Sequence, residues 1–161
     1  MIKQIEKEVS KVQLLAIFTQ FCDTHRSEES KRRIYRILRN AQNKKQSLKN
    51  IFLLEQAIKL NEVQAELMLK LVTAYLNKSD TRRKVTYEQK KRVLKRQNYI
   101  CPICKGTVDI TAHLDHIVPY KYVGDQLGED NFQMLCKSCN LHKSAKIDYQ
   151  LLELLKTGGT N

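Results

Sequence analysis

The sequence predicts an α+β protein that is mostly helical, with an N-terminal helical bundle followed by a smaller domain of short strands and helices. Three observations support this prediction. Apolar residues recur at helical spacing through residues 1–77, where no glycine or proline occurs. Four cysteines form two CxxC pairs, CPIC at 101–104 and CKSC at 136–139. Between these pairs, short apolar runs alternate with polar residues as strands of a hairpin do.

Composition indicates a globular protein with a polyanionic partner. The 161 residues are enough for one ordinary domain or two small ones, and the 42% hydrophobic and 29% charged fractions are typical of soluble proteins. A net charge of +12 favours nucleic acid as the partner, although a merely solubilising surface is the alternative. The early apolar run 14–18 is far too short to cross a bilayer or to act as a signal core. We therefore expect a cytoplasmic protein with no membrane partner.

Four helices are expected in residues 1–77. An apolar stripe predicts the first over 2–16, and Ser27 is the expected N-cap of the second. The third is expected after Ser47. The fourth begins at Asn61, whose capping role is supported by Gln64 three residues later. A small helical bundle is the simplest architecture for these elements.

The second helix opens an unusually basic stretch. Between residues 31 and 49 there are eight Lys or Arg and no acidic residue. Such a run is either a solvated face or a track for phosphates, and Arg32, Arg33 and Arg36 are the candidate nucleic-acid contacts.

The helices at 48–59 and 62–76 are joined by a very short turn, which is a weak helix-turn-helix signal. The connection lacks the usual glycine, and the second helix is mostly apolar or acidic where base contacts would be needed. Packing within the bundle or homodimerisation is therefore the preferred interpretation.

A polar, basic segment separates two regions of different character. We expect a helical domain for DNA binding or dimerisation at 1–77, a linker at 78–85 and a second domain at 86–161. Thr86 with Gln89 should cap a further basic helix that leads into the first CxxC pair. Residues 1–85 hold 18 basic and 9 acidic side chains, against 11 and 8 in residues 86–161. The first region is thus expected to supply affinity for a polyanion.

Two CxxC pairs have the spacing of a structural zinc site. Four thiolates close a tetrahedral shell around Zn²⁺, and a redox interpretation of one pair would leave the other unexplained. With all four positions taken by sulfur, the metal has no open site for chemistry. Binding of zinc can contribute about 10–16 kcal/mol to such a module. The expected ligands are Cys101, Cys104, Cys136 and Cys139, whereas Cys22 is expected to be a buried, inert thiol.

The stretch AHLDHIVPY at 112–120 places two histidines and an aspartate at the end of a predicted strand. A glycine-containing loop follows, then a second strand at 132–135, and then a helix from NLHKSAKID at 140–148. The cysteine pairs flank this unit, so residues at the end of the first strand should lie beside the start of that helix.

These segments carry a specific resemblance. HLDHIVPY and EDNFQMLCKSCNLHKS resemble the ββα-metal core of the HNH endonucleases, and the match covers roughly residues 86–147. Residues 1–77 match no family that we can name. Asn140 stands where many members have histidine, as in the HNN variants of the family.

The resemblance implies a metal-dependent endonuclease that hydrolyses DNA. Imidazole is the side chain suited to take a proton from water near neutral pH, so His116 is the expected general base. Asp115 and Asn140 are the expected ligands of a catalytic Mg²⁺ or Mn²⁺, because a carboxylate and an amide form a hard oxygen set. His113 is a possible third ligand or outer partner.

Two further residues are assigned by position. Asn131 corresponds to the middle asparagine of the family, which the resemblance implies is mainly an organiser of the loop. Lys143 lies three residues past Asn140, so it is a candidate for gripping a phosphate.

The main alternative is a zinc-stabilised nucleic-acid-binding module with no activity. The four residues Asp115, His116, Asn131 and Asn140 favour catalysis, because a pure binder does not need that combination. RNA as the substrate is not excluded, since phosphate contacts do not distinguish the sugars. Restriction, defence, phage and mobile-element roles all stay open.

Overall fold

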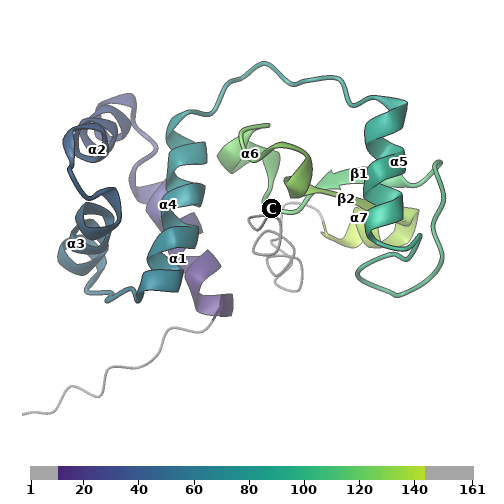
Figure 1. The fold of residues 1–161 in the computed structure, drawn as a ribbon, viewed down its shortest axis with the longest axis horizontal. Helices are drawn as coiled ribbons and strands as arrows, with labels where there is room; N and C mark the ends of the chain where they lie inside the picture. The colour runs from purple at the N-terminus through teal and green to yellow at the C-terminus, as the bar shows by residue number, and fades with distance from the viewer. Residues whose placement is uncertain (1–10, 144–161) are drawn as a thin grey trace, which may run out of the picture. The chain divides into compact units, whose positions relative to one another are not determined.

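The computed structural model describes residues 11–143. These residues fall into two compact units, with the boundary between Leu76 and Asn77. Figure 1 labels the helices and strands of both. Most of the predicted apolar stripe at 2–16 and the end of the predicted helix at 140–148 lie outside the described residues. No helix within the described part is long and apolar enough to cross a membrane.

The first unit consists, in its described part, of four helices (Figure 1). These are α1 (Lys11–Thr24), α2 (Glu28–Asn40), α3 (Lys44–Gln56) and α4 (Glu62–Leu76). Helix α4 packs against the other three. The apolar faces meet in a core whose largest fully buried side chains are Phe18, Phe21, Phe52, Leu15, Ile34, Leu48, Met68 and Leu71. Cys22 is buried as expected, and burial raises the pKa of its thiol well above the usual range.

The helix starts follow local hydrogen-bonding chemistry. The Ser27 side chain accepts from a backbone N–H of α2, and Asn61 and Gln64 exchange the two hydrogen bonds of a capping box, both as predicted. The prediction for the third helix was wrong by about one turn. Its N-cap is Asn43, whose Oδ1 accepts from the Gln46 N–H at 3.0 Å, so α3 begins before Ser47.

In the second unit, a helix packs against a two-stranded hairpin. Helix α5 (Tyr87–Arg96) begins with the predicted Thr86–Gln89 capping box. Strands β1 (His113–His116) and β2 (Phe132–Leu135) pair antiparallel, and α7 (Lys137–Lys143) follows β2. Between the strands, where a loop was expected, lie the short helix α6 (Tyr120–Val123) and the 3-10 helix η1 (Gly128–Asn131).

Helix α5 is attached to β2 by apolar and polar contacts. Val93 and Leu94 enter a buried cluster with Phe132, Met134 and Leu135. The Gln97 side chain, just past the helix, donates to the Met134 carbonyl at 2.8 Å and accepts from the Met134 N–H at 2.9 Å. This pairing satisfies the outer edge of β2 and fixes the hairpin beside the helix.

Candidate functional site

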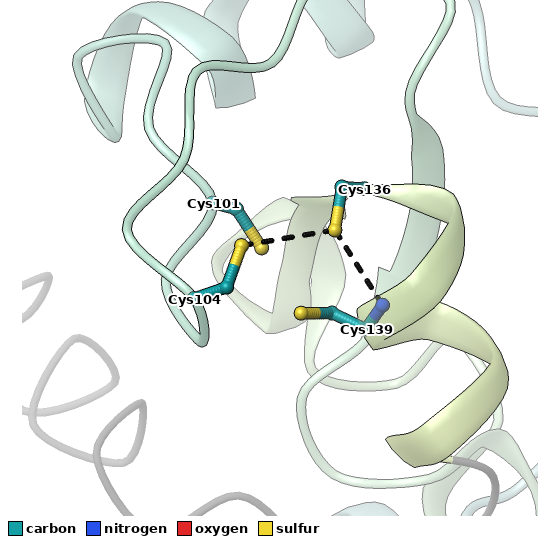
Figure 2. Close-up of side chains that lie close together, drawn as sticks. All are labelled: Cys101, Cys104, Cys136 and Cys139. Carbon is teal, nitrogen blue, oxygen red and sulfur yellow. Dashed lines mark hydrogen bonds between the residues drawn. The ribbon is translucent and has the colours of Figure 1, made fainter.

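The four cysteines of the CxxC pairs converge in the second unit. Figure 2 shows their side chains pointing toward a common centre, and the four Sγ atoms all lie within 4.8 Å of one another. One pair comes from the turn after α5 and the other from the junction of β2 with α7. The Cys104 and Cys136 sulfurs are 3.8 Å apart, and the Cys139 N–H donates to the Cys136 sulfur at 3.5 Å. This clustering agrees with the predicted zinc ligand set.

Two thiols of this cluster, those of Cys101 and Cys139, have pKa values shifted in opposite directions. Burial and hydrogen bonding with the neighbouring sulfurs raise the pKa of Cys139 to about 12. Burial by itself would also raise the pKa of the Cys101 thiol. Hydrogen bonds from the backbone N–H groups of Cys104, Cys136 and Ile103 outweigh this effect and lower the pKa to about 7. Without a cation, the cluster therefore does not carry four thiolates near neutral pH. A thiophilic dication with tetrahedral preference, as Zn²⁺ is, fits this donor set.

A second feature of this unit is a cleft of about 460 Å³. It brings together Asp115, His116 and Asn140, three of the residues to which the sequence assigns chemistry. The remaining lining residues are Arg82, Leu114, Pro119, Tyr120 and Lys121. Because β1 ends at His116, the alternation of strand side chains stops there, and adjacent residues can border one cleft.

The His116 ring is held on three sides. It is 5% exposed and packs edge-on against Tyr120 and Phe132, with ring centroids 5.3 and 5.0 Å away. Its Nε2 lies 3.0 Å from Asp125 Oδ1. Asp125 is a residue that the sequence analysis did not identify.

The protonation of Asp125 decides what the ring can do. Burial opposes ionisation of this carboxyl, but hydrogen bonds from the Arg83 N–H and the His116 ring outweigh burial and lower its pKa below the usual range. An ionised carboxylate can only accept, so the neutral ring carries its proton on Nε2. Nδ1 is then the basic nitrogen, and no described residue hydrogen-bonds it.

Asp115 is oriented through one of its two oxygens. Oδ2 accepts from Gln133 Nε2 at 2.7 Å and pairs with Lys143 Nζ at 2.9 Å. Gln133 lies directly opposite Asp115 in the β1–β2 register, which explains this contact, although the sequence analysis did not single it out. Both contacts of Asp115 fall on Oδ2, so the second oxygen, Oδ1, is left for another partner.

Lys143 lies in a different environment from the phosphate contact expected of it. The side chain is buried, at 6% exposed, and its Nζ also donates to the His116 carbonyl at 2.9 Å. Its ammonium group is therefore engaged by Asp115 and the β1 backbone. The helical spacing from Asn140 was estimated correctly, but the packing of α7 against the hairpin turns Lys143 inward.

Asn131 is buried, at 1% exposed, and its contacts are with backbone. Oδ1 accepts from the Val118 N–H at 2.8 Å, and Nδ2 donates to the Val118 carbonyl at 3.0 Å. The Asn131 carbonyl also accepts from the Ile117 N–H. Strand β1 ends at His116, so Ile117 and Val118 lie beyond it, where Asn131 holds their backbone.

His113 is placed away from these groups. It is exposed at the opposite end of β1, opposite Leu135, and is not among the residues that line the cleft. Asn140 lies about one turn into α7 rather than at its start, because the helix begins at Lys137.

The candidate arginines of α2 also line one cleft, in the first unit, of about 710 Å³. Arg32, Arg33 and Arg36 share it with Ser27, Glu29 and Ser30. Arg33 is partly committed elsewhere, because its guanidinium pairs with Glu55 at 3.0 Å. Within the described residues, Lys31, Lys45 and Lys49 also form ion pairs with acidic side chains. Acidic residues from outside the basic stretch 31–49 therefore offset part of its positive charge.

Comparison with known proteins identifies one family. The model of the HNH endonuclease family matches residues 101–146, a range that contains both CxxC pairs, Asp115, His116, Asn131 and Asn140. Neither the curated proteins nor the solved structures yield a match. Residues 101–146 of this chain therefore carry the sequence pattern of the HNH endonuclease family.

Proposed function

We propose that the protein is a metal-dependent endonuclease that hydrolyses DNA phosphodiester bonds. An HNH domain implies a nucleic-acid substrate, and the net charge of +12 suits one. The observation that carries the proposal is that an imidazole oriented by a carboxylate, His116 with Asp125, borders the same cleft as Asp115 and Asn140. A module that only binds DNA has no use for this arrangement.

Asp115 and Asn140 are the residues that would hold the catalytic cation. Asp115 Oδ1 and the amide oxygen of Asn140 are hard ligands, which favours Mg²⁺ or Mn²⁺ over zinc. A divalent cation bound there supplies positive charge that stabilises the negative charge developing on the phosphate and the departing oxygen. Lys143 and Gln133 keep the Asp115 carboxylate in one orientation. His113 is not needed for this set.

His116 is the proposed general base. Nδ1 takes the proton from the attacking water, while Asp125 holds Nε2–H and stabilises the charged ring that results. Tyr120 and Phe132 restrict rotation of the ring, and Asn131 fixes the backbone that follows His116. The ring is thereby preorganised before substrate binds.

The second metal has a separate, structural role. Zn²⁺ bound by the four cysteines leaves no coordination position for water or substrate, so it would connect the turn after α5 to the start of α7. Asn140 follows Cys139 directly. Loss of zinc is therefore expected to destabilise the fold and also to displace Asn140, a proposed ligand of the catalytic cation.

The test is cleavage of covalently closed plasmid DNA by the zinc-loaded protein in Mg²⁺. His116→Ala should abolish nicking without changing the zinc content or the circular dichroism spectrum. His142→Ala is the matched control, because His142 is exposed on α7 and, among residues 11–143, its ring hydrogen-bonds the Ser138 carbonyl alone. Omitting Mg²⁺ from the zinc-loaded protein should stop cleavage, and adding Mg²⁺ back should restore it.

Two outcomes would contradict the proposal. Equal nicking by wild type and His116→Ala would remove His116 from the role of base. DNA binding without any metal-dependent cleavage of DNA or RNA would instead favour the non-catalytic module.

A further inference from the structure

The segment 78–85, which the sequence suggests is a linker, packs against the cleft of its own unit. The Arg83 N–H donates to Asp125 Oδ2 at 2.8 Å, on the carboxylate whose other oxygen meets His116. At Gly124 there is little room for a side chain, because a Cβ would lie 3.2 Å from the Lys78 side chain and from the Ser79 carbonyl. These contacts fix the segment on the turn that follows α6.

The same contacts place Arg82 at the mouth of the cleft. Its guanidinium carbon lies 5.2 Å from the centre of the Tyr120 ring, and Arg82 lines the cleft together with Asp115, His116 and Asn140. A cation over an aromatic face is attracted by the ring quadrupole, so Tyr120 favours one placement of the guanidinium.

Arg82 has no ion-pair partner in the described part of the chain, although its charge helps to lower the pKa of the Asp125 carboxyl. Among residues 11–143, no carboxylate lies within ion-pair distance of it, although Arg92, Arg96 and Arg33 all have such partners. The nearby Asp125 already accepts from the Arg83 N–H and the His116 ring. The Arg82 side chain is exposed, so a ligand can reach it.

We propose that Arg82 binds the phosphate that is cleaved, and is thus a catalytic residue contributed from outside residues 101–146. This inference rests on the proposed nuclease function. A guanidinium offers two parallel N–H donors to phosphate oxygens and stays charged at all working pH values. Held by Tyr120 beside the cation ligands, it stabilises the negative charge that grows on the phosphate as water attacks. Arg82 accordingly extends the active site beyond residues 101–146, whereas Lys84 is not among the residues that line the cleft.

Single-turnover cleavage with the protein in saturating excess over DNA tests the proposal. Arg82→Gln should lower the rate constant at least tenfold, and Arg82→Lys should fall between Arg82→Gln and wild type, because it keeps the charge but loses the planar fork. Lys84→Gln is the matched control, since it removes one positive charge from the same exposed segment. It should weaken binding as much as Arg82→Gln does but change the saturated rate constant less than twofold.

Equal rate constants for Arg82→Gln and Lys84→Gln at saturation would overturn the inference. Zinc content and melting temperature, measured for each variant, should match wild type, which separates a chemical loss from unfolding.

A binding measurement separates failure of this inference from failure of the nuclease proposal. With zinc bound but without Mg²⁺ or Mn²⁺, the side-chain Nε–H signal of Arg82 is followed by NMR while a 12-base-pair duplex is added. A shift of this signal that saturates with the duplex supports phosphate binding by Arg82 even if the protein does not cleave. An unchanged signal with a bound duplex rejects it even if the protein does.

Discussion

The carboxylate of Asp125 provides the sharpest test of how His116 is oriented. It accepts two hydrogen bonds, one on each oxygen, from His116 Nε2 at 3.0 Å and from the Arg83 N–H at 2.8 Å. In Asp125→Asn the amide has only one oxygen. Its NH₂ group must face either the ring or the Arg83 N–H, and both of those are donors.

The expected loss follows from these two alternatives. If the NH₂ faces His116, the ring proton moves to Nδ1, and the nitrogen that should accept from water is no longer basic. If the NH₂ faces Arg83, two donors oppose each other and the turn shifts. A hydrogen bond to a charged group contributes about 1.5–3 kcal/mol. When this loss falls on the transition state, the cleavage rate decreases roughly 10- to 150-fold.

The assay is single-turnover nicking of supercoiled plasmid in Mg²⁺, with DNA binding measured in parallel. Asp125→Asn should slow cleavage while binding is retained. The control is Asp130→Asn, which makes the same chemical change nearby, where the carboxylate lies 3.8 Å from Arg96 instead of beside His116. Cleavage by Asp125→Asn at the rate of Asp130→Asn would refute the idea that a carboxylate orients the base.

Three other predictions concern stability and binding. Cys139→Ser should lower the zinc content and the melting temperature of the second unit, as measured by metal analysis and calorimetry, whereas unchanged zinc would contradict the four-sulfur site. Gly124→Ala should destabilise that unit by about 1–3 kcal/mol in urea unfolding, because φ is +57° and the added Cβ meets a backbone oxygen at 3.2 Å; full stability would contradict this packing. Replacing Arg32, Arg33 and Arg36 with Gln should weaken DNA binding and flatten its salt dependence, and an unaltered slope would leave that cleft without a role in binding.

Local chemistry explains which parts of the fold could be predicted. The Thr86–Gln89 and Asn61–Gln64 capping boxes depend on residues three positions apart, so sequence spacing identifies them. The CxxC pairs are equally local, and the metal preference of four sulfurs needs no further context.

Contacts that depend on tertiary packing were missed. Asp125 reaches His116 only because the chain turns at Gly124 with a positive φ after the unpredicted helix α6. The inward turn of Lys143 depends in the same way on how α7 packs against the hairpin. No periodicity in the sequence encodes either contact.

The segment before α5 makes contacts that its composition does not predict. Residues 78–85 are polar and basic, which is typical of a linker, and their composition does not indicate that they pack against a cleft. The fixed position of Arg83 comes from one backbone N–H, a group that every residue except proline carries. Composition therefore cannot distinguish a free linker from a segment that packs beside a cleft.

The proposed mechanism of cleavage rests on one claim above all. Asp115 and Asn140 are proposed to bind a catalytic cation that is separate from the zinc of the four cysteines. Anomalous diffraction at the manganese edge, from zinc-loaded crystals soaked in Mn²⁺, tests it directly. We expect a manganese peak bound to Asp115 Oδ1 and the Asn140 amide oxygen in wild type, and no such peak in Asp115→Ala. Manganese absent from wild-type crystals at these two side chains, or bound equally in the variant, would contradict the claim.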